Sequence, residues 1–118
     1  MPQIDHINIR VRDGKAMVAF LETILGAKEG FRPPFKHSGH WVYVDGKPQI
    51  HIDLLDPDTP DVRGNFDHVA FGVFEYAPLL ERVKSTGFQY EEAGIPGGVG
   101  QIFVYGPDHV KIELQFHR

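Results

Sequence analysis

The sequence contains no cysteine, and this absence excludes several kinds of site at once. A disulfide framework, a thiolate metal ligand and a cysteine nucleophile all need that residue. A chain without cysteine also suits a reducing compartment, so we expect a cytoplasmic protein. Long apolar runs are absent too, because no stretch approaches the roughly 20 residues that span a bilayer, and the polar N-terminus lacks a signal-peptide profile. We therefore expect no membrane partner.

An excess of positive charge is also lacking. The formal net charge is −4 and the sequence pI is about 5.9. Because a nucleic-acid-binding domain needs a basic face, we expect no nucleic acid as a partner. What remains is ordinary for one globular domain: 118 residues, of which 42% are hydrophobic and 24% are charged. A chain of this length is able to bury a core of its own.

The most informative feature is a repeat in which two strands begin with Asp-His. Residues 4–11 and 66–73 both alternate between polar and apolar side chains, which is typical of a half-buried strand. His68 follows His6 by 62 residues, and Glu113 follows His51 by the same 62 residues. Since residues two apart share one face of a strand, each of these four side chains falls on the polar face of its strand. Four residues of metal-binding types at matched positions indicate a metal site.

The order of predicted elements also repeats, on either side of an acidic, proline-bearing linker at residues 56–65. In the first half we predict a helix between an Asp13 N-cap and Gly26, a hairpin turn at Asp45-Gly46, and strands at 4–11, 27–31, 40–44 and 49–54. In the second half we predict a helix opened by Pro78 and ended by Gly87, with strands at 67–73, 88–92, 101–105 and 110–116.

These elements predict an α+β fold of two tandem βαβββ modules within one domain of residues 1–118. Module one spans residues 1–55 and module two spans residues 66–118. In each module a mixed four-stranded sheet would be covered by a helix on its apolar face, with a polar face on the other side.

At this point the chain resembles the vicinal oxygen chelate superfamily, which includes glyoxalase I, extradiol dioxygenases, fosfomycin-resistance enzymes and bleomycin-resistance proteins. The resemblance rests on Asp5-His6-Ile7-Asn8-Ile9, on Asp67-His68-Val69-Ala70-Phe71 and on residues 102–114. The family's Asp-Pro-Asp-Gly before the glutamate strand is replaced here by Gly106-Pro107-Asp108-His109. We expect the turn to survive, because histidine tolerates positive φ better than most residues.

The resemblance implies a U-shaped cup with helices outside, built around one divalent metal ion. Its ligands would be His6, His51, His68 and Glu113. Two-module members of the superfamily usually dimerise, and in many of them the cup combines one module from each chain. We therefore expect a homodimer with the metal site shared between chains, although a cup closed within one chain stays open.

Three imidazoles and one carboxylate suit zinc, nickel, cobalt, manganese or ferrous iron, and ligand softness does not separate these metals. By the resemblance, the metal would chelate two neighbouring oxygens of a small substrate and stabilise an enediolate-type intermediate. Glu113, or alternatively His51, would act as the catalytic base. We therefore predict a glyoxalase-like lyase or isomerase.

Two other functions stay open on the same fold. An extradiol ring-cleavage dioxygenase would hold ferrous iron with His6, His68 and Glu113, and His51 would crowd that iron as a fourth ligand. A non-catalytic small-molecule or drug-binding protein would use the cup without turnover. In each case the residues that we expect to contact the small molecule are Arg10, Arg32, Trp41, Phe103 and Tyr105.

Overall fold

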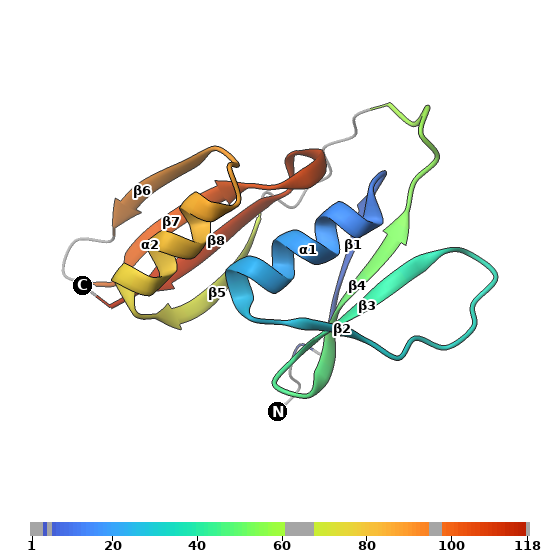
Figure 1. Ribbon diagram of the computed structural model, residues 1–118, viewed down its shortest axis with the longest axis horizontal. Helices are drawn as coiled ribbons and strands as arrows, with labels where there is room; N and C mark the ends of the chain where they lie inside the picture. The colour runs from blue at the N-terminus through green and yellow to red at the C-terminus, as the bar shows by residue number, and fades with distance from the viewer. Residues whose placement is uncertain (1–3, 5, 61–67, 95–97, 118) are drawn as a thin grey trace. The chain divides into compact units, whose positions relative to one another are not determined.

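The computed structural model describes residues 4, 6–60, 68–94 and 98–117 (Figure 1). The chain divides into two compact units, Met1–Pro60 and Asp61–Arg118. Part of the predicted linker, residues 61–65, lies outside the described residues, and so do Asp5 and Asp67 of the two repeated motifs.

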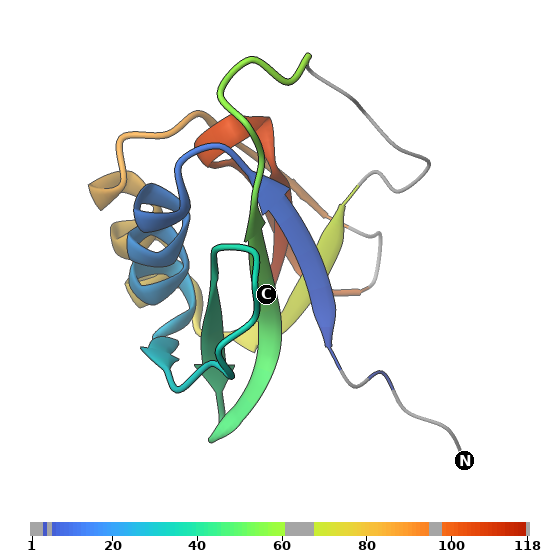
Figure 2. The same ribbon diagram turned by 90° about the vertical axis from the view of Figure 1, so that its right-hand side faces the viewer.

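The first unit is a mixed four-stranded sheet with one helix packed against it (Figure 2). Its strands are β1 (Ile7–Val11), β2 (Lys28–Gly30), β3 (Gly39–Val44) and β4 (Lys47–Leu54), and their order in the sheet is β1-β4-β3-β2. β1 runs parallel to β4, whereas β3 is antiparallel to both β4 and β2. The turn between β3 and β4 has positive φ at Asp45 (52°) and Gly46 (74°), which confirms the predicted Asp-Gly hairpin.

Helix α1 (Gly14–Leu25) begins and ends as the sequence predicts. The Asp13 side chain accepts a hydrogen bond of 3.0 Å from the Ala16 backbone N–H, which is the N-cap interaction. Gly26 closes the helix in the left-handed conformation with φ 69°, and its N–H donates to the Glu22 carbonyl. The apolar side of α1 is buried together with the apolar face of the sheet, including Met17, Leu21, Ile24, Val42, Ile50 and Ile52.

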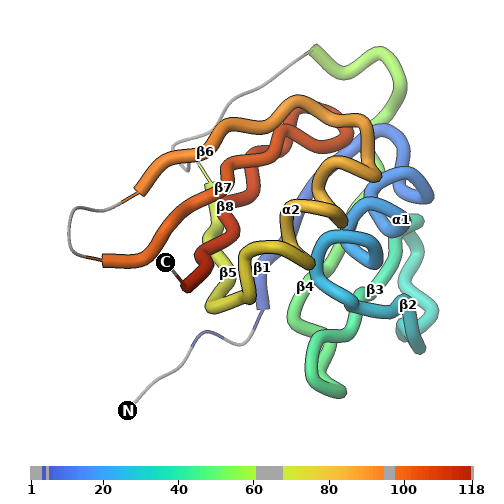
Figure 3. The backbone as a smooth tube through the Cα atoms, turned by 60° about the vertical axis from the view of Figure 1, so that its left-hand side comes forward, coloured from blue at the N-terminus to red at the C-terminus, as the bar shows by residue number. Residues whose placement is uncertain are grey.

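The second unit repeats this topology, as the tube in Figure 3 makes clear. Its elements are β5 (Val69–Phe74), α2 (Tyr76–Ser85), β6 (Tyr90–Gly94), β7 (Gly100–Tyr105), a short 3₁₀ turn at Pro107–His109 and β8 (Lys111–Phe116). The strand order is β5-β8-β7-β6, with β5 parallel to β8 and the remaining pairs antiparallel. Two βαβββ modules of the same connectivity confirm the predicted fold class.

The core of the second unit lies between α2 and one face of its sheet. Leu79 and Val83 of α2 are fully buried, and the Tyr76 ring packs 4.5 Å from the Phe116 ring of β8. The buried face of the sheet consists of Ile102, Val104, Ile112, Leu114 and Phe116. The opposite face carries the polar side chains that form the candidate site.

Two details of the second unit differ from the prediction. α2 begins at Tyr76 behind a Glu75 N-cap, so Pro78 lies inside the first turn instead of opening the helix. The backbone N–H groups of the first helical turn have no intrahelical acceptor, so proline is tolerated at more than one position of that turn. β6 starts at Tyr90, two residues later than predicted.

The turn before β8 survives the loss of the family's usual sequence. Asp108 and His109 both adopt positive φ, at 59° and 61°. The Gly106 N–H donates to the Val110 carbonyl at 2.9 Å, which closes the turn. The substitution by histidine therefore leaves the entry into β8 intact, and with it the position of Glu113.

Among the residues that the structure describes, no helix is both long enough and apolar enough to cross a membrane.

Candidate metal centre

His68 and Glu113, the two predicted ligands of the second unit, lie in contact. Glu113 is on β8, paired in register with Ala70 of β5, and His68 directly precedes β5. The His68 Nε2 atom is 3.0 Å from Glu113 Oε1. The Glu113 side chain is 7% exposed, whereas His68 is 30% exposed, so the carboxylate lies at the base of the pair and the imidazole nearer to solvent.

Glu113 is held from its other oxygen by two amides that the sequence did not single out. Gln115 Nε2 donates to Glu113 Oε2 at 3.0 Å and Gln101 Nε2 donates to the same oxygen at 3.2 Å. Burial alone would raise the pKa of Glu113, but the hydrogen bonds from Gln115 and Gln101, together with His68, outweigh burial and lower the pKa below its ordinary value. The side chain is therefore held as a carboxylate, the form that binds metal ions.

The predicted ligands of the first unit, His6 and His51, lie together in a different manner. Their rings are stacked, with centroids 3.8 Å apart and an interplanar angle of 11°. The other face of His51 stacks on Trp41 of β3, at 4.1 Å and 10°. His51 is thus the middle ring of a three-ring stack, half-buried on β4, while His6 is exposed.

The two pairs fit a metal ion to different degrees. Two donor atoms at about 2.1 Å from one ion lie about 3.0 Å apart when they occupy adjacent positions at a right angle. The His68–Glu113 separation matches that spacing. The His6 and His51 rings do not fit as they stand, because the lone pair of an imidazole nitrogen lies in the ring plane and two stacked, nearly parallel planes do not meet at one ion. One of these rings has to turn about its side-chain bonds before both nitrogens bind.

Each unit on its own therefore contains a pair of predicted ligand residues. Within the part of the chain that the structure describes, no group of three or more histidine, aspartate or glutamate side chains is gathered in a way that would hold a metal ion. The four-ligand set stays a prediction.

The predicted substrate-contacting residues of the second unit lie beside its ligand pair. Phe103 is paired with Glu113 in register, and its ring meets His68 edge-on at 5.6 Å. Tyr105 is paired with Lys111, whose ammonium group lies 4.8 Å above the Phe103 ring and 5.9 Å above the Tyr105 ring. All of these side chains are on the face of the sheet opposite the core.

In the first unit, Trp41 is in the ring stack, and Phe35 lies next to it with a centroid distance of 6.1 Å. Arg10 is exposed on β1, opposite Asp53 in register. Arg32 is largely buried, because only 14% of its side chain is exposed, and its guanidinium lies 4.9 Å from the Phe35 ring centroid.

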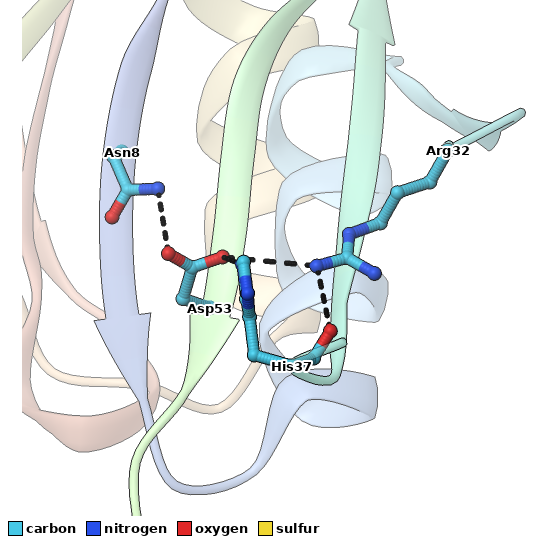
Figure 4. A network of polar contacts seen from close by, with 4 residues as sticks. All are labelled: Asn8, Arg32, His37 and Asp53. Atoms are coloured by element: carbon cyan, nitrogen blue, oxygen red, sulfur yellow. Dashed lines mark hydrogen bonds and ion pairs between the residues drawn. The ribbon is translucent and has the colours of Figure 1, made fainter. Parts of the chain in front are cut away.

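Asp53 anchors a polar network that the sequence did not single out (Figure 4). Asn8 Nδ2 donates to one carboxylate oxygen at 3.1 Å, while His37 Nε2 at 3.3 Å and Arg32 at 4.0 Å meet the other oxygen. Arg32 also donates to the His37 carbonyl at 3.0 Å. The network fixes the proline-rich segment 31–38 to the polar face of the sheet. Alternation along β4 placed Asp53 on that face, but only the tertiary structure identifies its partners.

Comparison with known proteins identifies the family to which this chain belongs. A sequence model of the Glyoxalase/Bleomycin resistance protein/Dioxygenase superfamily matches residues 3–114. The chain belongs to this superfamily. The match contains all four predicted ligands, and it confirms the resemblance to vicinal oxygen chelate proteins that the sequence motifs indicated.

The individual relatives are distant in sequence, and the solved structures among them are similar in fold. The chain is 26% identical to the uncharacterized protein YwbC of Bacillus subtilis (strain 168), and the match covers 95% of each chain. A solved glyoxylase/bleomycin resistance protein/dioxygenase domain from Frankia sp. EAN1pec has a TM-score of 0.81 at 20% identity, covering 100% of this chain and 99% of that one.

A further solved structure of similar fold is that of a mutant of the fosfomycin resistance protein FosX from Listeria monocytogenes. It was solved in complex with Mn(II) and 1S,2S-dihydroxypropylphosphonic acid. Its TM-score is 0.76 at 24% identity, and the match covers 98% of this chain and 92% of that one. At this level of identity the likeness is one of fold.

Proposed function

We propose that this protein is a divalent-metal-dependent, glyoxalase-like lyase or isomerase that acts on a small substrate with two neighbouring oxygen atoms. Its metal ligands are His6, His51, His68 and Glu113. The observation that carries the proposal is the His68–Glu113 pair, whose donor atoms are 3.0 Å apart and whose carboxylate is already ionised and hydrogen-bonded. The Mn(II) complex of the Listeria monocytogenes protein supports a divalent metal in this fold.

A bound metal would supply Lewis-acid polarisation of the two substrate oxygens. Around it, the chain's own residues have separate tasks. Glu113 is fixed by Gln101 and Gln115 and has a lowered pKa, which suits a permanent ligand better than a proton acceptor. His51 is held in two ring stacks that compete with metal binding, so between the two predicted bases we assign the proton-accepting role to His51.

The aromatic side chains would form the walls for the substrate. Trp41 beside Phe35 in the first unit, and Phe103 beside Tyr105 in the second, present ring surfaces next to the predicted ligands. Two of the nearby positive charges already have partners, because Arg32 forms an ion pair with Asp53 and the Lys111 ammonium lies over the Phe103 and Tyr105 rings. We therefore expect a small substrate of low charge, with Arg10 as the exposed cation at the rim.

Metal analysis of the purified protein tests this proposal directly. We expect about one divalent ion per chain, and single alanine variants at His6, His51, His68 and Glu113 should each bind it more weakly by at least about tenfold. His117→Ala is the matched control, because His117 is an exposed histidine outside the site. Unchanged metal content in all four variants would refute the proposed ligand set.

We further propose that the protein is a homodimer in which each metal is held by the first unit of one chain and the second unit of its partner. Closed, two-fold assemblies are the commonest form of soluble oligomer, and a shared site would make binding depend on association. The mixing experiment described in the Discussion distinguishes this arrangement from a site completed within one chain.

One observation favours a second candidate function. His51 is held between Trp41 and His6, and if it stays there the remaining set is His6, His68 and Glu113. Two imidazoles and one carboxylate with open positions are the ligand set of ferrous-iron oxygenases. An extradiol dioxygenase would consume oxygen with catechols after anaerobic iron loading, and His51→Ala would keep full iron affinity. Absence of oxygen uptake from the iron-loaded protein would remove this candidate.

A further inference from the structure

The two oxygens of Glu113 have different surroundings. Oε2 accepts hydrogen bonds from both Gln115 (3.0 Å) and Gln101 (3.2 Å), whereas Oε1 lies 3.0 Å from His68 Nε2. Two amide donors occupy the lone pairs of Oε2, so Oε1 is the oxygen available for a cation beside His68. Among the residues that the structure describes, Glu113 is the one buried polar or charged residue. Its hydrogen bonds therefore determine how its side chain is oriented.

The sheet register explains how two amides reach the same oxygen. Gln101 of β7 and Gln115 of β8 are directly opposite each other, and Glu113 is the next residue of β8 on the same face. On the other side, β5 has Gly72 next to Gln115: a side chain added at Gly72 would bring its Cβ within 2.8 Å of the Gln115 Cβ. The absence of a side chain at Gly72 therefore leaves the space that Gln115 occupies.

The first unit serves as an internal comparison, because its residues map onto the second at an offset of 62. At the place of Gln101 it has Gly39, and at the place of Gln115 it has Asp53. Asp53 bonds with Asn8, His37 and Arg32, while His51 is held by ring stacking. The amide pair thus occurs where the ligand is a carboxylate, and not where the ligand is an imidazole.

We propose that Gln101 and Gln115 are positioning residues that make Glu113 a one-oxygen metal ligand. This inference rests on the proposed metal-binding function. Both donors are uncharged, so they orient the carboxylate without cancelling the negative charge that attracts the metal, as an arginine or lysine would do. Removing them releases Oε2, which lets the carboxylate rotate or bind through both oxygens.

Methionine substitutions test the inference, because methionine has nearly the length of glutamine and no N–H donor. The variants are Gln101→Met, Gln115→Met and the double variant, with Gln89→Met as the control at an exposed position outside the site. Mn(II) affinity is measured by competition with a chromophoric chelator. We expect each single variant to bind Mn(II) about tenfold more weakly and the double variant about 100-fold more weakly, in the range found for residues that orient metal ligands. The control should match the wild-type affinity.

The absorption spectrum of bound Co(II) provides a readout that a purely structural role would not change. If Oε2 joins Oε1 on the metal, the coordination number rises and the visible bands weaken and shift. The shorter amides in Gln101→Asn and Gln115→Asn keep the polarity but lose the reach, so they should reproduce the Met result. They also cover the case in which a methionine variant does not fold, which circular dichroism would reveal.

Two results would overturn the inference, and they are distinguishable. If Glu113→Ala loses Mn(II) while the double glutamine variant keeps the wild-type affinity and Co(II) spectrum, the positioning role is wrong and the proposed function stands. If the wild-type protein binds neither Mn(II) nor Co(II), the proposed function falls and this inference falls with it.

Discussion

His51 has two competing uses, and the protein's single tryptophan reports which one is in force. In the structure the His51 ring lies between Trp41 and His6, at 4.1 Å and 3.8 Å. Because two stacked rings do not reach one ion, metal binding by both His6 and His51 breaks their stack, and it also breaks the stack with Trp41 if His51 is the ring that turns. At least one of the three stacked rings therefore has to leave the stack when a metal ion binds both histidines.

We predict that metal binding changes the emission of Trp41. As the imidazole stack is rearranged, the intensity and the wavelength of the tryptophan fluorescence should shift with a midpoint equal to the metal dissociation constant. A fluorescence titration with Mn(II) or Zn(II) measures this. His51→Ala should abolish the change, whereas His117→Ala should keep it. A saturable change of equal size in His51→Ala would contradict the involvement of His51.

At the residue scale, the sequence predicted which ligands pair but not how their side chains are arranged. The spacing of 45 residues is the same between His6 and His51 as between His68 and Glu113, and both pairs are in contact. Strand alternation fixes only the face on which a side chain lies. The ring stack and the two glutamine hydrogen bonds depend on rotamers and on strand register, which a single sequence does not specify.

The elements of the second unit are joined by a side-chain contact between α2 and β6. The Tyr76 hydroxyl, at the start of α2, donates to Glu92 Oε1 of β6 at 2.7 Å. That hydrogen bond raises the pKa of Tyr76, and desolvation and the negative charge of Glu92 act in the same direction. A raised pKa means that the folded protein keeps the tyrosine proton more tightly than the unfolded chain does.

We predict that one tyrosine titrates above the ordinary range near pH 10, as followed by phenolate absorbance. Because the pKa is raised in the folded state, the stabilisation is complete below the ordinary pKa and is lost as pH rises through the higher value. Glu92→Gln should therefore return the titration toward the ordinary range, and its stability deficit should shrink at alkaline pH. Glu91→Gln, on the same strand, is the control. If it has the same effect as Glu92→Gln, the contact is not the cause.

The segment 31–38 of the first unit depends on Asp53. Asp53→Ala removes the partner of Asn8, His37 and Arg32, and it leaves the largely buried guanidinium of Arg32 without its carboxylate. We predict that this variant loses about 1–3 kcal/mol of unfolding free energy, the cost of hydrogen bonds to charged groups and of a stranded partner. Urea denaturation measures the loss, with exposed Asp58→Ala as the control. Equal stability of the two variants would show that the network is dispensable.

At the element scale, local chemistry was the reliable guide. The Asp13 cap, the Gly26 stop and the Asp45-Gly46 turn are each fixed by a residue's own conformational preference, and all three predictions are confirmed. The start of α2 was placed wrongly at Pro78, because proline marks a first turn without marking its first residue. Where several positions satisfy the same local rule, tertiary packing chooses between them.

The whole molecule consists of two units, each with half of the proposed ligand set. A metal held by both units would stabilise both, by about 2.7 kcal/mol when the free metal is at 100 times its dissociation constant. Trp41 reports only on the first unit, whereas the circular dichroism signal reports on both.

We predict that saturating Mn(II) raises the unfolding midpoint equally by tryptophan fluorescence and by circular dichroism, and that a chelator reverses the change. Glu113→Ala, which alters only the second unit, should abolish the shift seen at Trp41 of the first unit. If the Trp41 transition does not move with metal, the ion is bound by the second unit alone and the four-ligand proposal is wrong.

Mixing two inactive variants reveals which chains complete a site. One chain carries His6→Ala and His51→Ala, and the other carries His68→Ala and Glu113→Ala. If sites are shared between chains, co-refolding regenerates about a quarter of the sites, because half of the dimers are mixed and each mixed dimer has one intact set. Metal binding and size-exclusion chromatography check this. No recovery of binding in a dimer would indicate a site closed within one chain.

At this largest scale, the sequence predicted the tandem fold through its repeat, and the superfamily match confirmed it. Substrate choice is not predictable in the same way, because it depends on the shape of loops such as 31–38 rather than on the ligand set. Neither Asp53 nor the glutamine pair belongs to the motifs that identify the superfamily.

Gly39 is a position at which the two units of the repeat are not interchangeable. A side chain at Gly39 would collide with the carbonyl oxygen of Ile52 and press on Arg32. The equivalent residue of the second unit is Gln101, whose side chain donates a hydrogen bond to Glu113. A glutamine at position 39 would require strand β4 to move, because its Cβ would overlap the Ile52 carbonyl oxygen. At this position the first unit therefore cannot acquire the amide of the second unit by a point mutation alone.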